Sequence, residues 1–194
     1  MLLIAACLAL LASPLLAGRW SSALLTHRWR WPLTIWLVLA LQVVVVEVDL
    51  PDPLAAVLHI ATYAAGVAFL VLNRTVPGIL VVAAGAMTNG LTIALNAGVL
   101  PATSGAVRAA GLAPTAAFAN SGVVDHPVLP WLGDVFAWPA PLPLANTFSV
   151  GDVLIAVGVG AAAWTGTQRL GRGLRRADDA HAEQCLDEPT VGPL

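Results

Sequence analysis

Charged residues are scarce in this chain, and lysine is absent. Only 10% of its 194 residues are charged, and its nine basic residues are all arginines. In soluble domains about a quarter of the residues are charged. The shortage argues against an ordinary soluble domain. No basic patch with interleaved aromatic residues occurs either, so no nucleic-acid partner is expected.

Cysteine is scarce as well, and familiar catalytic motifs are missing. Cys7 lies in an apolar segment and Cys185 in a hydrophilic tail, so no disulfide framework is expected. Neither has a metal ligand close by in the sequence. The chain contains no phosphate-binding glycine loop, no His-Glu-x-x-His, no paired Cys-x-x-Cys and no Gly-x-Ser-x-Gly. We therefore expect no cofactor and no metal, and these absences weigh against an enzyme.

Apolar residues make up 58% of the chain and gather in five long segments. Such segments are typical of helices that cross a hydrocarbon core of about 30 Å. We therefore predict an all-α fold, a polytopic membrane bundle of five transmembrane helices within residues 1–168. The expected spans are residues 2–17, 32–48, 54–72, 76–100 and 149–167. Residues 101–148 are expected to form a partly helical extracytoplasmic segment, and residues 169–194 a disordered cytoplasmic tail.

The extracytoplasmic segment is rich in proline and glycine and contains two helix-start signals. Thr103 or Ser104 fits the N-cap of a short helix through Ala110. Pro114 fits the first position of another helix, through Asn120. The apolar patches between these signals favour an ordered segment that lies on the outer membrane interface.

The arginines predict the orientation of the chain in a membrane. With five spans and an outside N-terminus, all of them except Arg108 lie on the cytoplasmic side, where basic residues concentrate beside spans. We therefore expect a multi-pass protein of a bacterial plasma membrane, with its C-terminus in the cytoplasm. The expected partners are membrane lipids, and other membrane proteins or further copies of the chain. The cytoplasmic set is Arg19, Arg28, Arg30, Arg74, Arg169, Arg172, Arg175 and Arg176.

Polar residues follow one stripe of the fourth segment, where lipid-facing residues should be apolar. The stripe contains Gly78, Gly85, Asn89, Thr92 and Asn96, which fall on one side of a helix with 100° per residue. Lipid does not tolerate such a face, so it is expected to face protein. The third segment has a similar stripe, and the short connection between the two segments favours adjacent helices.

Facing stripes predict a polar pocket that opens to the outside of the membrane. Its expected ligand is an ion, a small polar molecule or a lipid headgroup. Two alternatives stay open: the asparagines can join helices by hydrogen bonds, and Asp152 can complete an N-cap with Ser149. The candidate ligand-binding residues are Glu47, His59, Tyr63, Asn89, Thr92, Asn96, Asp134 and Asp152.

Four short motifs, taken together and in order, resemble a family of small bacterial membrane proteins of unknown function that is common in actinobacteria. The chain differs in having Ala97 and Leu100 where the family usually has glycine and methionine. The resemblance implies a bacterial plasma membrane and about five spans, and it implies no activity. The motifs are residues 96–101 (Asn-Ala-Gly-Val-Leu-Pro), 118–121 (Phe-Ala-Asn-Ser), 132–134 (Leu-Gly-Asp) and 149–155 (Ser-Val-Gly-Asp-Val-Leu-Ile).

Three classes of function follow from these patterns. The first is a binding or accessory membrane protein with the outward-facing pocket. The second is a structural subunit of a larger complex, supported by the small-residue ridge that includes Ala9 and Ser13. The third is a membrane-embedded enzyme that uses His59 with Glu47 or Asp152 as acid and base.

Overall fold

The computed structural model describes residues 2–48, 50–112 and 121–169. Two predictions lie outside these ranges: the helix expected over residues 114–120, with most of the motif at 118–121, and the disordered state of the tail beyond residue 169. The side chain of Glu47 is also outside the description, although its backbone ends a helix.

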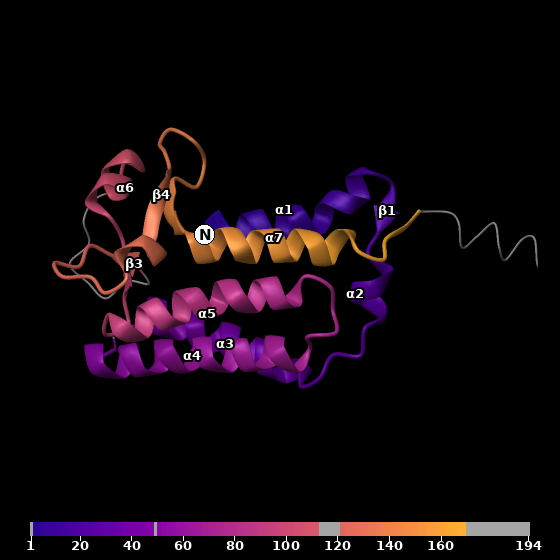
Figure 1. Ribbon diagram of the computed structural model, residues 1–194, viewed down its shortest axis with the longest axis horizontal. Helices are drawn as coiled ribbons and strands as arrows, with labels where there is room; N and C mark the ends of the chain where they lie inside the picture. The colour runs from indigo at the N-terminus through magenta and orange to yellow at the C-terminus, as the bar shows by residue number, and fades with distance from the viewer. Residues whose placement is uncertain (1, 49, 113–120, 170–194) are drawn as a thin grey trace, which may run out of the picture.

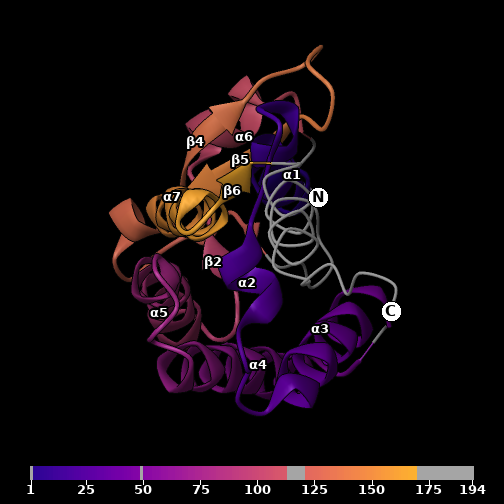
Figure 2. The ribbon, with the colours of Figure 1, turned by 90° about the vertical axis from the view of Figure 1, so that its right-hand side faces the viewer.

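Five long helices run side by side along the long axis of the molecule (Figure 1). Two of them have a proline at the first or second helical position, where the missing N–H costs no helical hydrogen bond. Figure 2 shows the five as an open arc in the order α1, α7, α5, α4, α3, each packed on the next. The helices are α1 (Leu2–Leu16), α3 (Pro32–Glu47), α4 (Asp52–Leu72), α5 (Ile79–Leu95) and α7 (Val150–Trp164).

Short elements lie at both ends of the long helices. At one end, residues 100–112 and 121–149 form a cap that contains α6 (Ser104–Ala109), a 3-10 turn at Pro130–Leu132 and four strands (Figure 1). In the cap, β2 (Leu100–Pro101) pairs in parallel with β3 (Ser121–Gly122), and β4 (Asp134–Trp138) pairs antiparallel with β5 (Asn146–Ser149). At the other end lie α2 (Ser22–Thr26) and an antiparallel pair, β1 (Arg19–Trp20) with β6 (Gln168–Arg169).

The prediction of an all-α bundle of five transmembrane helices is wrong. Within the described residues, α4 alone has the length and composition to cross a membrane, and three two-stranded sheets occur. The other four apolar helices are shorter, at 10–17 residues. The segment at 76–100 shows the reason: positive φ angles at Gly78 (83°), Ala97 (55°) and Gly98 (93°) bend the chain at both ends. The remaining 17-residue helix rises only about 26 Å, less than a core of about 30 Å.

The tightest packing joins α5 to α7 through glycines. A Cβ atom on Gly85 would lie 2.4 Å from the carbonyl oxygen of Gly151, and one on Gly158 would lie 2.7 Å from the carbonyl oxygen of Gly78. Real Cβ atoms do not come so close to backbone, so a larger residue would push the two helices apart. The polar stripe of α5 continues from this contact toward the cap.

Candidate functional site

A buried polar cluster joins α5 to the start of α7. Asn89 on α5 donates through Nδ2 to Oδ1 of Asp152 at 2.8 Å. Its Oδ1 accepts from the hydroxyl of Ser149 at 2.8 Å. Ser149 and Asp152 also form a complete capping box, which satisfies the free N–H groups at the first turn of α7. Asp152 therefore takes the N-cap role that the sequence predicted. Its carboxylate also accepts a hydrogen bond from a second helix, α5.

Close approach of the backbone makes this cluster possible. Asn89 is 1% exposed, and a Cβ on Gly151 would lie 2.0 Å from its Oδ1 atom. The amide therefore fills the space that a side chain at Gly151 would need. Ser149 is fully buried, so the hydrogen bonds from its hydroxyl and backbone are made away from solvent.

Asp134, at the start of β4, is the most unusual group in the cap. It is 4% exposed, and its Oδ2 accepts from the hydroxyls of Ser121 at 2.6 Å and Thr147 at 3.0 Å. Its Oδ1 is buried and has no hydrogen-bond partner among the described residues. Burial, with a smaller contribution from the charge of Asp152, raises the pKa of Asp134 to about 6, although the two hydroxyl bonds lower it.

Asn96 fastens the cap to the end of α5. Its Nδ2 donates to the carbonyl of Val128 at 2.9 Å, and its Oδ1 accepts from the N–H of Val128 at 2.8 Å. The side chain thus pairs with one residue of the cap as a neighbouring strand would. Thr92, one turn earlier, is fully buried and donates to the carbonyl of Thr88 within the same helix.

The polar stripe of α4 makes separate contacts. His59 is fully buried, and its Nδ1 lies 2.6 Å from the carbonyl oxygen of Gly98. Its ring meets the ring of Tyr63 edge to face, with centroids 5.4 Å apart. Thr62 donates to Oε1 of Gln42 on α3. These bonds tie α4 to the turn after α5 on one side and to α3 on the other.

One family model matches residues 25–164, a family of unknown function designated DUF5317. The chain belongs to this family. No curated protein and no solved structure matches the chain. The matched range begins within α2 and ends with the last residue of α7, so it contains all eight predicted site residues.

In this DUF5317 protein the predicted residues fall into separate groups. Asn89 and Asp152 are in direct contact, and Asp134 is close enough to Asp152 for the two charges to interact. Asn96 contacts the cap backbone, and the side chain of Glu47 is not described. Among the described residues, no group of three histidine, cysteine, aspartate or glutamate side chains is placed to hold a metal ion.

Sequence reasoning missed three polar residues that carry much of this arrangement. Ser121 and Thr147 hold Asp134, and Asn73, at the C-cap of α4, repeats the pairing that Asn96 makes. Asn73 exchanges two hydrogen bonds with the backbone of Arg30, at 2.8 and 3.1 Å. An asparagine directly after a helix was the available signal for Asn73. Ser121 stood out only as the last residue of the motif at 118–121, and Thr147 carried no signal in its local sequence.

Proposed function

We propose that this DUF5317 protein is an accessory protein of a bacterial membrane, a structural subunit that holds lipid and another membrane protein against its apolar helix faces. The observation that carries the proposal is that its buried polar side chains form hydrogen bonds to other parts of the same chain. Asn89, Asn96 and Asp152 form hydrogen bonds within the chain, between elements that would otherwise separate. Such bonds hold the described elements together, as interhelical hydrogen bonds do in membrane proteins.

The apolar surface supports a place in a membrane. Contiguous exposed apolar patches are rare on soluble monomers and mark contact with lipid or protein. Here large apolar side chains are exposed along each of the long helices, and Leu37 on α3 is 69% exposed. The α3 helix also packs mainly on α4, so most of its circumference is uncovered (Figure 2). Exposed members of α3 are Leu33, Trp36, Leu37, Leu39, Val43 and Val44.

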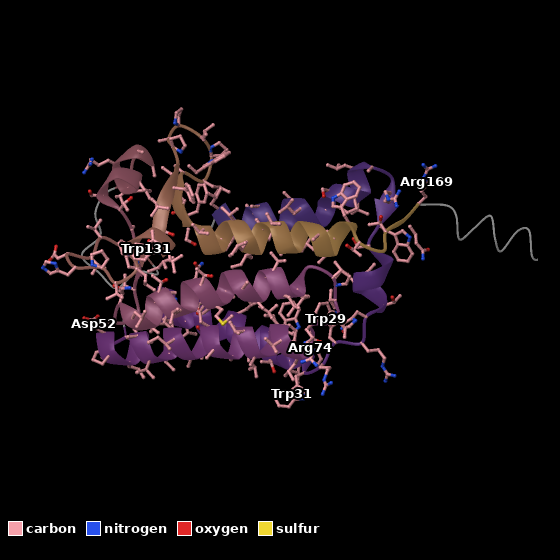
Figure 3. The ribbon with its side chains drawn as sticks, in the orientation of Figure 1. Trp29, Trp31, Asp52, Arg74, Trp131 and Arg169 are labelled. Carbon is pink, nitrogen blue, oxygen red and sulfur yellow. The ribbon has the colours of Figure 1, made fainter. Side chains whose placement is uncertain are left out.

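The positions of the charged residues support one orientation of the protein in the membrane. Arg74 and Arg169 lie at the end opposite the cap, with Trp29 and Trp31, whereas Asp52 and Trp131 lie at the cap end (Figure 3). Basic residues gather on the cytoplasmic side of membrane proteins. The proposed orientation therefore places the cap outside the cytoplasm.

The test is the mass of the full-length protein after gentle detergent extraction from carbonate-washed membranes. We expect it to resist carbonate and to migrate well above its own 20.0 kDa in native mass spectrometry, with a second chain at fixed stoichiometry. Ala9→Trp, on an exposed position of α1, should release that chain. Ala84→Trp, on an exposed position of α5, is the matched control. Extraction by carbonate, or a lone chain in native spectra, would disprove the proposal.

Ser13 is unsuitable for this test. Its hydroxyl accepts from Nε1 of Trp164 at 2.9 Å, so replacing Ser13 would disturb the packing of α1 on α7. A lost complex would then have two explanations, whereas Ala9 makes no such contact on the described structure.

Asp134 favours a second candidate function, the binding of a small cation under the cap. A buried carboxylate oxygen without a described partner is a costly group that a bound cation would stabilise. Sodium, potassium or calcium should then raise the melting temperature of the wild type and leave Asp134→Asn unchanged. Equal shifts in the two proteins would remove this candidate. The catalytic alternative draws no support from the contacts of His59 and Asp152, which serve the helix packing.

A further inference from the structure

Two arginines face each other at the end of the molecule opposite the cap. Arg19 in β1 is the register partner of Arg169 in β6, so the two side chains leave the same face of a two-stranded antiparallel ladder. Residues paired in this way have Cβ atoms only about 5 Å apart, and like charges at that distance repel. The pairing calls for an anion between the two guanidinium groups.

No anion of the described chain lies at this end. The described acidic residues belong to the cap or to the helix ends that face it, as Asp52 does in Figure 3. Arg19 uses two of its five N–H donors on Thr167, with Nε 2.8 Å from the hydroxyl and Nη2 3.3 Å from the carbonyl oxygen. Thr167 therefore fixes the guanidinium while other donors remain for an anion.

Exposed apolar and aromatic residues lie close to the two arginines along the chain. Leu16, at the end of α1, is 92% exposed, and Leu15 is 57% exposed. Trp20 follows Arg19 in β1 and is 37% exposed, and Trp164 ends α7 with 46% exposed. Tryptophan settles at the level of lipid headgroups, and exposed leucines suit acyl chains. This end of the molecule thus exposes two cations, two amphipathic rings and the leucines that end α1.

We infer that Arg19 and Arg169 together bind the phosphate of an anionic phospholipid whose acyl chains lie along the exposed leucines of α1. Planar guanidinium groups match phosphate oxygens through paired hydrogen bonds, so two of them make a specific clamp. The inference rests on the proposed membrane location and adds the class of lipid. Arg74 lies at the same end (Figure 3), Arg30 is hydrogen-bonded to its neighbour Asn73, and Arg28 directly precedes Trp29, so these arginines raise the local concentration of anionic lipid.

The test is lipid retention by the full-length protein from nanodiscs with equal amounts of phosphatidylglycerol and phosphatidylcholine, measured by native mass spectrometry. The wild type should retain one phosphatidylglycerol in preference to phosphatidylcholine. At about 1 kcal/mol for each arginine near an anionic surface, Arg169→Gln should lower this retention roughly 5-fold, and Arg19→Gln with Arg169→Gln roughly 30-fold. Arg169 forms no described side-chain hydrogen bond, so its variant should fold as the wild type does.

Controls separate this site from general attraction and from free phosphate. Arg108→Gln, which removes an exposed arginine from α6 in the cap, should leave retention unchanged. Millimolar inorganic phosphate should not displace the lipid, because the acyl chains supply part of the binding. Equal retention of the two lipids, equal loss with Arg108→Gln, or displacement by phosphate would overturn the inference. A protein that inserts into nanodiscs without lipid preference would refute this site alone, whereas failure to insert would refute the proposed function.

Discussion

Replacing Asp134 with asparagine should remove a gain in stability that the wild type shows on acidification. The carboxyl has a usual pKa of 3.8 and a pKa of about 6 in the folded protein, chiefly because it is buried. In the folded state the charged form is therefore disfavoured. As pH falls through about 6, the folded protein takes up a proton that the unfolded chain does not yet bind, so the free energy of unfolding rises until about pH 4.

The size of the effect follows from the pKa difference of about 2 units. One unit corresponds to about 1.4 kcal/mol, so the wild type should gain about 3 kcal/mol between about pH 7 and about pH 4. In a chain of this length 1 kcal/mol shifts the melting temperature by about 2 to 4 °C. The corresponding rise is about 6 to 12 °C. An amide at position 134 can still accept from Ser121 and Thr147 but has no proton to take up.

The assay is thermal unfolding in a mild detergent, followed by tryptophan fluorescence across this pH range. Only the difference between the wild type and Asp134→Asn isolates the carboxyl, because other acids titrate in both proteins. Asp125→Asn, which removes an exposed acid from the same cap, is the control and should keep the wild-type dependence. The reasoning fails if Asp134→Asn shows the same pH dependence as the wild type, or if the difference has the opposite sign.

Three further substitutions test the helix contacts, each followed by chemical unfolding in detergent. Gly151→Ala should cost about 1 to 3 kcal/mol, because its new methyl group meets the amide oxygen of Asn89; an unchanged midpoint would contradict the close packing. Asn96→Ala should cost about 1 to 3 kcal/mol and speed hydrogen exchange at Val128, and exchange at the wild-type rate would rule out the pairing. Asn73→Ala should lower the free energy of unfolding by a similar amount. It should speed hydrogen exchange at Arg30, in the loop before α3, and leave hydrogen exchange in the cap unchanged.

Helix positions could be predicted from the sequence, and the ends of α1, α3 and α4 lie within two residues of the predicted ones, but the ends of α5 could not be predicted. The long helices fall within the apolar segments because an apolar run bounded by proline or glycine favours a helix there. Their ends depend on backbone angles, and Ala97 shows the difficulty. It takes a φ of 55°, a conformation that favours glycine, so the left-handed turn begins at a residue whose type does not predict it, although Asn96 and Gly98 on either side are typical of helix ends. The five spans were mistaken because helices of only 15 to 17 residues were counted as long enough to cross a membrane, and because the run at 76–100 was counted as one helix.

The candidate site was predictable where its contacts are local. Ser149 and Asp152 are three residues apart, and the capping box follows from that spacing alone. Burial of Asn89 and Thr92 follows from the polar stripe on an apolar helix. The partners of Asp134 were not predictable, because Ser121 and Thr147 reach it only through the register of short strands in the cap. Of the two interpretations of the asparagines, hydrogen bonding between elements describes the contacts of Asn89 and Asn96, but their partners, Asp152, Ser149 and the backbone of Val128, could not be predicted from the polar stripes.

Two asparagine side chains that pair with loop backbone affect how freely the amino-acid sequence of those loops can vary. Asn73 forms hydrogen bonds with the main chain of Arg30, and Asn96 with the main chain of Val128. Main-chain atoms are the same whatever side chain is attached. Positions 30 and 128 can therefore accept many different amino acids while these hydrogen bonds remain. Surfaces at the two ends of the molecule can diversify to suit new partners, provided that these two amides stay in place.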